Sequence, residues 1–125
     1  MQIIGIDIGG TKCAVSVLRN GVVEEVDRFP TSDYAATLAR YRETVARLRP
    51  GPDAVFGISC GGPLDAARGI ILNPPNLPGW VNIEICRAFT DCFGGRAYLM
   101  NDANASALAE WHFGAGKGCR HMVFL

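Results

Sequence analysis

A carboxylate and a glycine turn stand together near the start of the chain. Asp7 lies at the end of an apolar run, and Gly9 and Gly10 follow it. Since glycine has no Cβ, the backbone can turn tightly there, and its N–H groups can approach a phosphate closely. A carboxylate at a strand end beside such a turn is well placed to hold hydrated Mg²⁺ near phosphates. The residues indicate phosphate chemistry, although a hairpin turn with a solvated aspartate would also explain them.

This glycine turn is not a P-loop. No Gly-Lys-Ser/Thr follows a four-residue spacer, and no helix is expected to begin there. The later run Gly-Ala-Gly-Lys-Gly at residues 114–118 is not a nucleotide loop either, because it follows a predicted helix instead of linking a strand to a helix. It suits the end of a helix and a flexible crossing to a second domain.

A second carboxylate, Asp102, directly follows the apolar segment 96–101. Ligands of α/β folds bind at the carboxyl ends of strands. Transfer of phosphate to an acceptor hydroxyl needs a carboxylate that orients the hydroxyl and accepts its proton. Asp102 could instead only cap the helix predicted over residues 103–113, which is a common role for aspartate. The segment alone favours the cap.

Two loops between these carboxylates could contact a polar ligand. Gly61, Gly62 and Pro63 follow a buried strand, where backbone groups could meet a ligand or simply form a turn. The Pro-rich loop, residues 73–80, holds three prolines and is therefore stiff. Its asparagines and tryptophan suit sugar recognition, but we expect Trp80 itself to anchor the loop in the core.

Four segments together closely resemble the N-terminal half of the ROK family (repressors, open reading frames and kinases), a branch of the sugar kinase/actin-like superfamily. In chain order they cover residues 7–12, 58–65, 73–80 and 101–105. The resemblance extends over essentially all 125 residues. Family members are more than twice as long, and their second half carries a Cys-rich zinc motif, a second phosphate loop and the adenosine pocket. The resemblance therefore implies residues 1–118 as the N-terminal domain and residues 119–125 as the start of the next one.

The resemblance implies an ATP-dependent hexose kinase of the glucokinase type. The phosphates of MgATP would lie on Gly9, Gly10 and Thr11, and Asp7 would hold the magnesium through water. Lys12 would add charge near the phosphates or point outward from the second strand. The family's zinc site would lie in the absent C-terminal half, and the full-length protein is expected to be a homodimer.

The sugar site implied by the resemblance comes from the later motifs. Asp102 matches the general base of the family, which also contacts the sugar, and Asn101 matches the residue that binds sugar hydroxyls. Gly62 matches a glycine that contacts the sugar through its backbone. The choice among glucose, fructose, allose, N-acetylglucosamine and N-acetylmannosamine cannot be read from these residues.

The predicted elements place these residues at strand ends. The predicted strands cover residues 2–8, 12–19, 22–30, 53–59 and 96–101. Residues 69–72 are expected to return as part of a hairpin. Helices are expected from near Asp33 and over residues 82–93 and 103–113. Three hairpin strands followed by β–α units is the layout of an actin-like ATPase, or ribonuclease H-like, α/β domain with a mixed sheet. Alternation puts Asp7 on the face opposite Ile4, Ile6 and Ile8.

The first predicted helix has one apolar side. Its stripe consists of Tyr34, Leu38, Tyr41, Val45 and Leu48. Thr31 or Ser32 is the expected N-cap, and Pro50 is expected to prevent the helix from continuing. The arginines on the other side, including Arg40, are expected to form a solvated face.

The composition is that of an ordinary folded domain. The chain has 125 residues, 49% of them hydrophobic and 19% charged. Its 12 basic and 12 acidic residues balance, which argues against a nucleic-acid surface. No segment has the length of a membrane span, so we expect a cytoplasmic enzyme. ATP and a hexose are the partners that the resemblance implies. The five cysteines show no metal-ligand spacing and are expected to be reduced and buried.

Two alternatives belong to other functional classes. ROK-type regulators carry a DNA-binding helix-turn-helix before the sugar domain, whereas the first strand here is expected close to Met1. A non-catalytic actin-like module would bind a partner protein, but the presence of both Asp7 and Asp102 argues against it. We expect residues 1–125 alone to be inactive, since half of the nucleotide site would be absent.

Overall fold

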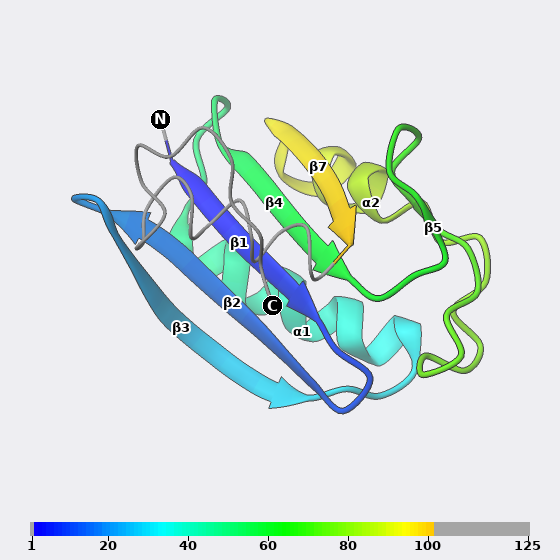
Figure 1. Ribbon diagram of the computed structural model, residues 1–125. Helices are drawn as coiled ribbons and strands as arrows, with labels where there is room; N and C mark the ends of the chain where they lie inside the picture. The colour runs from blue at the N-terminus through cyan, green and yellow to red at the C-terminus, as the bar shows by residue number, and fades with distance from the viewer. Residues whose placement is uncertain (1, 102–125) are drawn as a thin grey trace, which may run out of the picture.

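A mixed five-stranded sheet forms the centre of the molecule, and the computed structural model describes it within residues 2–101 (Figure 1). The strand order is β3-β2-β1-β4-β7. The first three strands form an antiparallel meander, and β4 and β7 extend the sheet parallel to β1. The bounds are Ile3–Ile8 for β1, Lys12–Arg19 for β2, Val22–Pro30 for β3, Val55–Cys60 for β4 and Arg96–Asn101 for β7. This confirms the predicted meander followed by β–α units.

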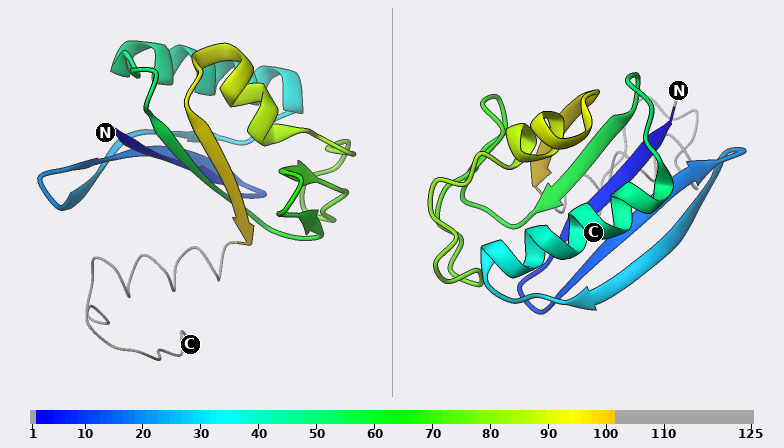
Figure 2. Two further views of the ribbon diagram at one scale, coloured as in Figure 1. Left: turned by 90° about the horizontal axis from the view of Figure 1, so that it is seen from above. Right: turned by 180° about the vertical axis from the view of Figure 1, so that it is seen from behind.

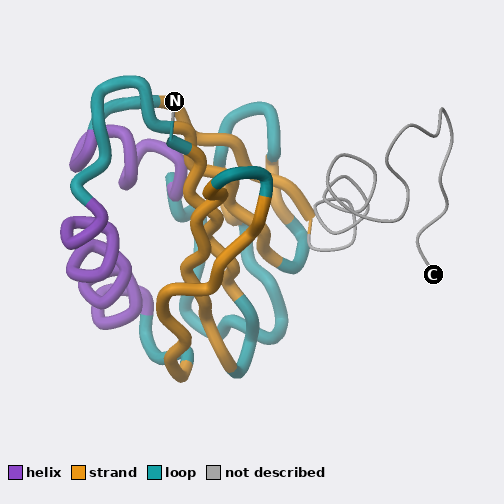
Figure 3. Tube along the Cα trace, turned by 90° about the vertical axis from the view of Figure 1, so that its left-hand side faces the viewer, coloured by secondary structure: helices purple, strands orange, loops and turns teal. Residues whose placement is uncertain are grey.

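Two helices cover one face of the sheet. Helix α1 (Tyr34–Leu48) connects β3 to β4, and α2 (Ile85–Phe93) precedes β7. Both helices lie on the same side in Figure 2, and Figure 3 shows them as one layer beside the strands. A small hairpin of β5 (Leu64–Asp65) and β6 (Ile70–Ile71) lies in the connection between β4 and α2.

The core lies between the helices and the covered face of the sheet. Strand β1 alternates as the sequence predicts, with Ile4, Ile6 and Ile8 at most 1% exposed and Asp7 exposed on the other face. Aromatic rings from three elements meet in this core, where the ring of Phe89 lies 5.4 Å from Phe56 and 6.0 Å from Tyr41. Burial of these side chains is the main force that holds the helices against the sheet.

The start of α1 differs from the prediction. The N-cap is Asp33, whose carboxylate accepts a hydrogen bond from the N–H of Ala36 at 2.8 Å. The hydroxyl of Thr31 is directed instead to the glycine turn, where it donates to the carbonyl of Gly9. The N–H of Ser32 instead donates to the hydroxyl of Thr37, so Ser32 lies outside the helix.

The sides of α1 follow the predicted pattern in part, since Tyr34 and Leu48 of the expected stripe are only half-buried. Leu38, Tyr41 and Val45 are buried as expected. Arg40, however, does not belong to a freely solvated face, because it forms a two-pronged ion pair with Asp27 of β3 at 2.9 and 3.0 Å. Its guanidinium also lies over the ring of Phe29, 4.9 Å from the centroid.

Several predicted boundaries shift by a few residues. Helix α2 begins at Ile85, three residues later than expected, because the N–H groups of Asn82 and Ile83 bond to Leu72 and Ile71. Strand β4 begins at Val55, because the N–H of Ala54 closes a turn onto Gly51. The helix predicted over residues 103–113 lies outside the described residues.

The cysteines are not all buried. Cys13 and Cys60 are buried as expected, whereas Cys86 is half-buried and Cys92 is exposed near the end of α2. Within residues 2–101, no helix is both long enough and apolar enough to span a membrane.

Candidate active site

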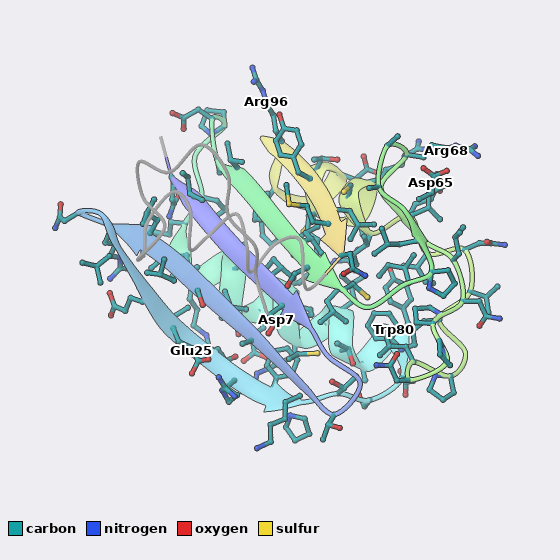
Figure 4. The ribbon with its side chains drawn as sticks, viewed as in Figure 1. Asp7, Glu25, Asp65, Arg68, Trp80 and Arg96 are labelled. Carbon is teal, nitrogen blue, oxygen red and sulfur yellow. The ribbon has the colours of Figure 1, made fainter. Side chains whose placement is uncertain are left out.

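The described residues of the predicted site lie at the end of the sheet where the parallel strands finish. Ile8 of β1 pairs with Cys60 of β4, and Cys60 pairs with Asn101 of β7, so the three strands end in register. The loops that follow β4 lie at this same end (Figure 1). In Figure 4, Asp7 and Trp80 lie toward this end, and Arg96 lies at the opposite end. Parallel strands thus bring distant parts of the sequence together.

The glycine turn, residues 9–11, has a shape that needs glycine. The N–H of Gly9 donates to the carbonyl of Lys12 at 3.0 Å, which closes the turn between β1 and β2. A Cβ on Gly9 would lie 2.6 Å from that carbonyl oxygen, so an alanine would clash. The N–H groups of Gly10 and Thr11 donate to no residue in the described part of the chain. Those two amides remain able to bind a ligand.

Lys12 opens β2 with an exposed side chain. Cys13, Val15 and Val17 face the core, so alternation puts Lys12 on the opposite face of the sheet, the one that carries Asp7. An ammonium group there can approach either solvent or a phosphate at the glycine turn.

Asp7 is held by two neighbouring elements. Its Oδ1 accepts a hydrogen bond from the hydroxyl of Ser59 at 2.9 Å, across the β1–β4 pair. Its backbone carbonyl accepts a hydrogen bond from the hydroxyl of Tyr41, which is 1% exposed. Burial raises the pKa of Tyr41, with a further contribution from its interaction with Cys13, so this hydroxyl stays protonated and remains a donor.

Sequence reasoning assigned neither Ser59 nor Tyr41 to the site. Ser59 has the same position in β4 that Asp7 has in β1, so strand alignment could have found it. Tyr41 belongs to the apolar stripe of α1, and nothing in that pattern separates its packing role from its hydrogen bond. Only the tertiary structure shows the second role.

The Pro-rich loop packs directly against the glycine turn. A Cβ on Gly10 would lie 2.9 Å from the carbonyl oxygen of Asn76 and 3.0 Å from its Cβ. Trp80 is 2% exposed and meets the ring of Tyr34 edge-on at 5.3 Å, which confirms it as the anchor of this loop. Between the two loops lies a cavity of about 310 Å³, lined by residues that include Thr31, Asp33 and Leu77.

The two described residues of the predicted sugar site lie side by side. A Cβ on Gly62 would lie 3.7 Å from the amide nitrogen of Asn101. The Gly62–Pro63 peptide bond is cis. Asp102, the predicted base, lies outside the described residues, as do residues 114–118. The structure thus brings Gly62 and Asn101 together.

Asp7 is an exposed acidic residue at the end of β1, directly before the glycine turn. Within residues 2–101, no group of three or more His, Cys, Asp or Glu side chains is arranged to hold a metal ion. Mg²⁺ commonly keeps several waters and binds through one or two carboxylates together with phosphate oxygens. An exposed carboxylate next to two unengaged amides fits that mode and does not fit a cage made of protein ligands alone.

Comparison with known proteins shows the family of this chain. The sequence model described as the ROK family matches residues 3–125. The chain belongs to the ROK family. The match spans nearly the whole sequence and so includes all four of the motifs at this site.

The relatives of this ROK chain include sugar kinases. It is similar to a glucokinase of Thermotoga maritima, with 32% identity over 130 residues that cover 100% of this chain and 41% of the relative. It is also similar to a fructokinase of Zymomonas mobilis, with 33% identity that covers 96% of this chain and 42% of the relative. The chain therefore spans about two fifths of the length of these proteins.

Solved ROK structures share the fold. A ROK glucokinase from Streptomyces griseus, in complex with glucose and AMPPNP, superposes with a TM-score of 0.79 and 31% identity, over 94% of this chain and 38% of that one. A ROK hexokinase from Thermus thermophilus gives a TM-score of 0.76 and 35% identity, over 94% and 41%. These neighbours confirm the predicted actin-like ATPase fold.

Proposed function

We propose that this chain is the N-terminal, phosphate- and sugar-binding part of an ATP-dependent hexose kinase of the glucokinase type. The observation that carries the proposal is the convergence of Asp7, the glycine turn, Gly62 and Asn101 at the carboxyl ends of β1, β4 and β7. Relatives named glucokinase and fructokinase support the same reaction class.

In this proposal the glycine turn binds the phosphates. The amides of Gly10 and Thr11 donate to phosphate oxygens, while Gly9 shapes the turn through its bond to Lys12. Lys12 lies on the Asp7 face and adds positive charge. Asp7 holds the waters of Mg²⁺, with Ser59 orienting its carboxylate. When bound, MgATP supplies the phosphoryl group and the charge neutralisation that its transfer requires.

The sugar side is assembled at the end of β4 and β7. Gly62 offers backbone groups, and Asn101 offers an amide within reach of the same space. Asp102 follows Asn101 directly in the sequence, and we propose it as the group that accepts the proton of the attacking sugar hydroxyl. The Pro-rich loop stiffens the wall beside this site, since Trp80 fixes it to α1.

Further properties of the whole protein follow from the resemblance alone. A homodimer, a cytoplasmic location, a zinc site in the C-terminal part and a domain that begins at residues 119–125 stay predictions. The sugar-sensing regulator and the non-catalytic module stay as the alternatives.

A coupled assay of ADP release tests the proposed function. The full-length protein that contains this chain is incubated with MgATP and, one at a time, glucose, fructose, allose, N-acetylglucosamine and N-acetylmannosamine. We expect release of ADP that depends on at least one of these sugars. A full-length protein that binds a sugar without turnover would instead indicate a regulator, and the kinase proposal would be wrong.

A further inference from the structure

Thr31 lies between β3 and α1 and forms two hydrogen bonds to the glycine turn. Its N–H donates to the carbonyl of Thr11 at 2.9 Å, and its hydroxyl donates to the carbonyl of Gly9 at 2.7 Å. Both ends of the turn are therefore bonded to one residue. This contact joins segments that lie 22 positions apart in the sequence.

The hydroxyl of Thr31 also has a third contact, with Cys13. The Sγ of Cys13 lies 3.1 Å from the Oγ1 of Thr31. The carbonyl of Gly9 can only accept a hydrogen bond, so the Thr31 hydroxyl donates its proton to that carbonyl. In the contact with Cys13, the thiol is therefore the donor and the Thr31 oxygen is the acceptor. Cys13 is 1% exposed, so this donor is protected from competing water.

Thr31 has no role in starting the neighbouring helix. Asp33 caps α1, and the hydroxyl of Thr37 accepts the N–H of Ser32. The polar groups of Thr31 that donate hydrogen bonds are both directed to the turn. The role of Thr31 therefore concerns the glycine turn and not the start of α1.

We propose that Thr31 is a positioning residue, which holds the glycine turn in one conformation so that the amides of Gly10 and Thr11 are preorganised for phosphate. The inference rests on the proposed function, since it assigns a task to the turn. A loop already held in its binding conformation loses less entropy when the ligand binds. Two bonds from Thr31 supply that restraint, because among residues 2–101 the turn is otherwise closed by a single backbone hydrogen bond, from Gly9 to Lys12.

The test compares two substitutions in the full-length protein. Thr31→Val keeps the shape but removes the hydroxyl, and Thr31→Ser keeps the hydroxyl. For Thr31→Val we expect the KM for ATP to rise about 5- to 30-fold, as the loss of a hydrogen bond would give, with the KM for sugar within about twofold. Thr31→Ser should restore a near-normal KM for ATP.

Hydrogen exchange gives a readout that does not need turnover. In Thr31→Val the amides of residues 9–11 should exchange faster, while those of α1 stay unchanged. Thr31→Ala offers the same comparison if Thr31→Val does not fold. Lower thermal stability with an unchanged KM for ATP and unchanged exchange at the turn would overturn the positioning role. A wild-type protein without sugar phosphorylation would overturn the proposed function instead, and the exchange result would still decide the role of Thr31.

Discussion

The hydroxyl of Ser59 donates to the carboxylate of Asp7 at 2.9 Å, across two neighbouring parallel strands. This bond orients an exposed acidic side chain that would otherwise rotate freely at the end of β1. The hydroxyl of Tyr41 fixes the backbone of the same residue from the opposite face of the sheet. Asp7 is thus restrained at both its side chain and its main chain, which the proposed metal-binding role requires.

Ser59→Ala should weaken the response of the full-length enzyme to magnesium. Groups that orient a metal-binding carboxylate contribute to metal affinity, so we expect the half-saturating Mg²⁺ concentration to rise about tenfold. Ser16→Ala is the matched control. Ser16 of β2 pairs with Gly5 of β1, so it lies on the face of the sheet that carries Asp7 but is not paired with Asp7. Identical magnesium titrations for the two variants would show that Ser59 does not act through Asp7.

Gly10→Ala should destabilise the contact between the glycine turn and the Pro-rich loop. The new Cβ would lie 2.9 Å from the carbonyl oxygen of Asn76, and overpacking of this kind costs about 1–3 kcal/mol. Denaturant unfolding measures the loss. Adding Asn76→Gly removes the side-chain part of the clash and should restore part of the stability. A Gly10→Ala protein as stable as the wild type would contradict the contact.

Tyr41→Phe should cost stability without disturbing the aromatic core. The ring keeps its edge-on contact with Phe29 at 4.9 Å, but the carbonyl of Asp7 loses its donor. We expect a decrease of about 1 kcal/mol in the free energy of unfolding. Tyr34→Phe is the control, since the hydroxyl of Tyr34 has no hydrogen-bond partner among the described residues. Equal losses of unfolding free energy in Tyr41→Phe and Tyr34→Phe would argue against the hydrogen bond from Tyr41 to the carbonyl of Asp7.

The ion pair of Asp27 predicts a pH dependence. Hydrogen bonds from Arg40 and then from Thr44 hold the pKa of Asp27 below its ordinary value of 3.8. Because the pKa of Asp27 is lower in the folded state, the ionised carboxylate stabilises the fold, and this contribution is fully present above pH 3.8. It is lost as the pH falls through the lower pKa of the folded state. Asp27→Asn should therefore reduce the free energy of unfolding by about 1–2 kcal/mol at pH 7.

The same variant should differ less from the wild type in acid. Unfolding curves at pH 7 and at about pH 3 give the comparison. Glu25→Gln serves as the control, because Glu25 pairs with Arg28 at an exposed position and should change stability little at either pH. A difference for Asp27→Asn that persists unchanged in acid would contradict the assigned cause.

The sequence predicts the sheet well because its signals are local. Alternation in β1 and the turn at Asn20 and Gly21 define the meander, and the stripe of α1 gives its buried side. The errors occur where a side chain has a partner distant in the sequence. Thr31 was predicted as a helix cap, but its hydroxyl donates to the carbonyl of Gly9. Arg40 was predicted to be solvated, but it forms an ion pair with Asp27.

The candidate site was predicted only in part, because some of its contacts join residues that are distant in the sequence. Asp7 and the glycine turn are adjacent in the sequence, so their chemistry can be read directly. The bond from Ser59 crosses 52 positions, and the contact of Gly10 with Asn76 depends on how the Pro-rich loop folds back. No local pattern contains either contact. Both appear only when the parallel strands bring their carboxyl ends together.

Asp102→Asn tests most directly the proposal that this chain provides the sugar-activating part of a hexose kinase. The change keeps the shape of the side chain but removes the proton acceptor. In the full-length protein we predict that kcat for the preferred hexose falls about 10²- to 10⁴-fold, while sugar affinity measured by calorimetry changes only a few-fold. Near-normal turnover by Asp102→Asn would contradict the account and leave Asp102 as a helix cap.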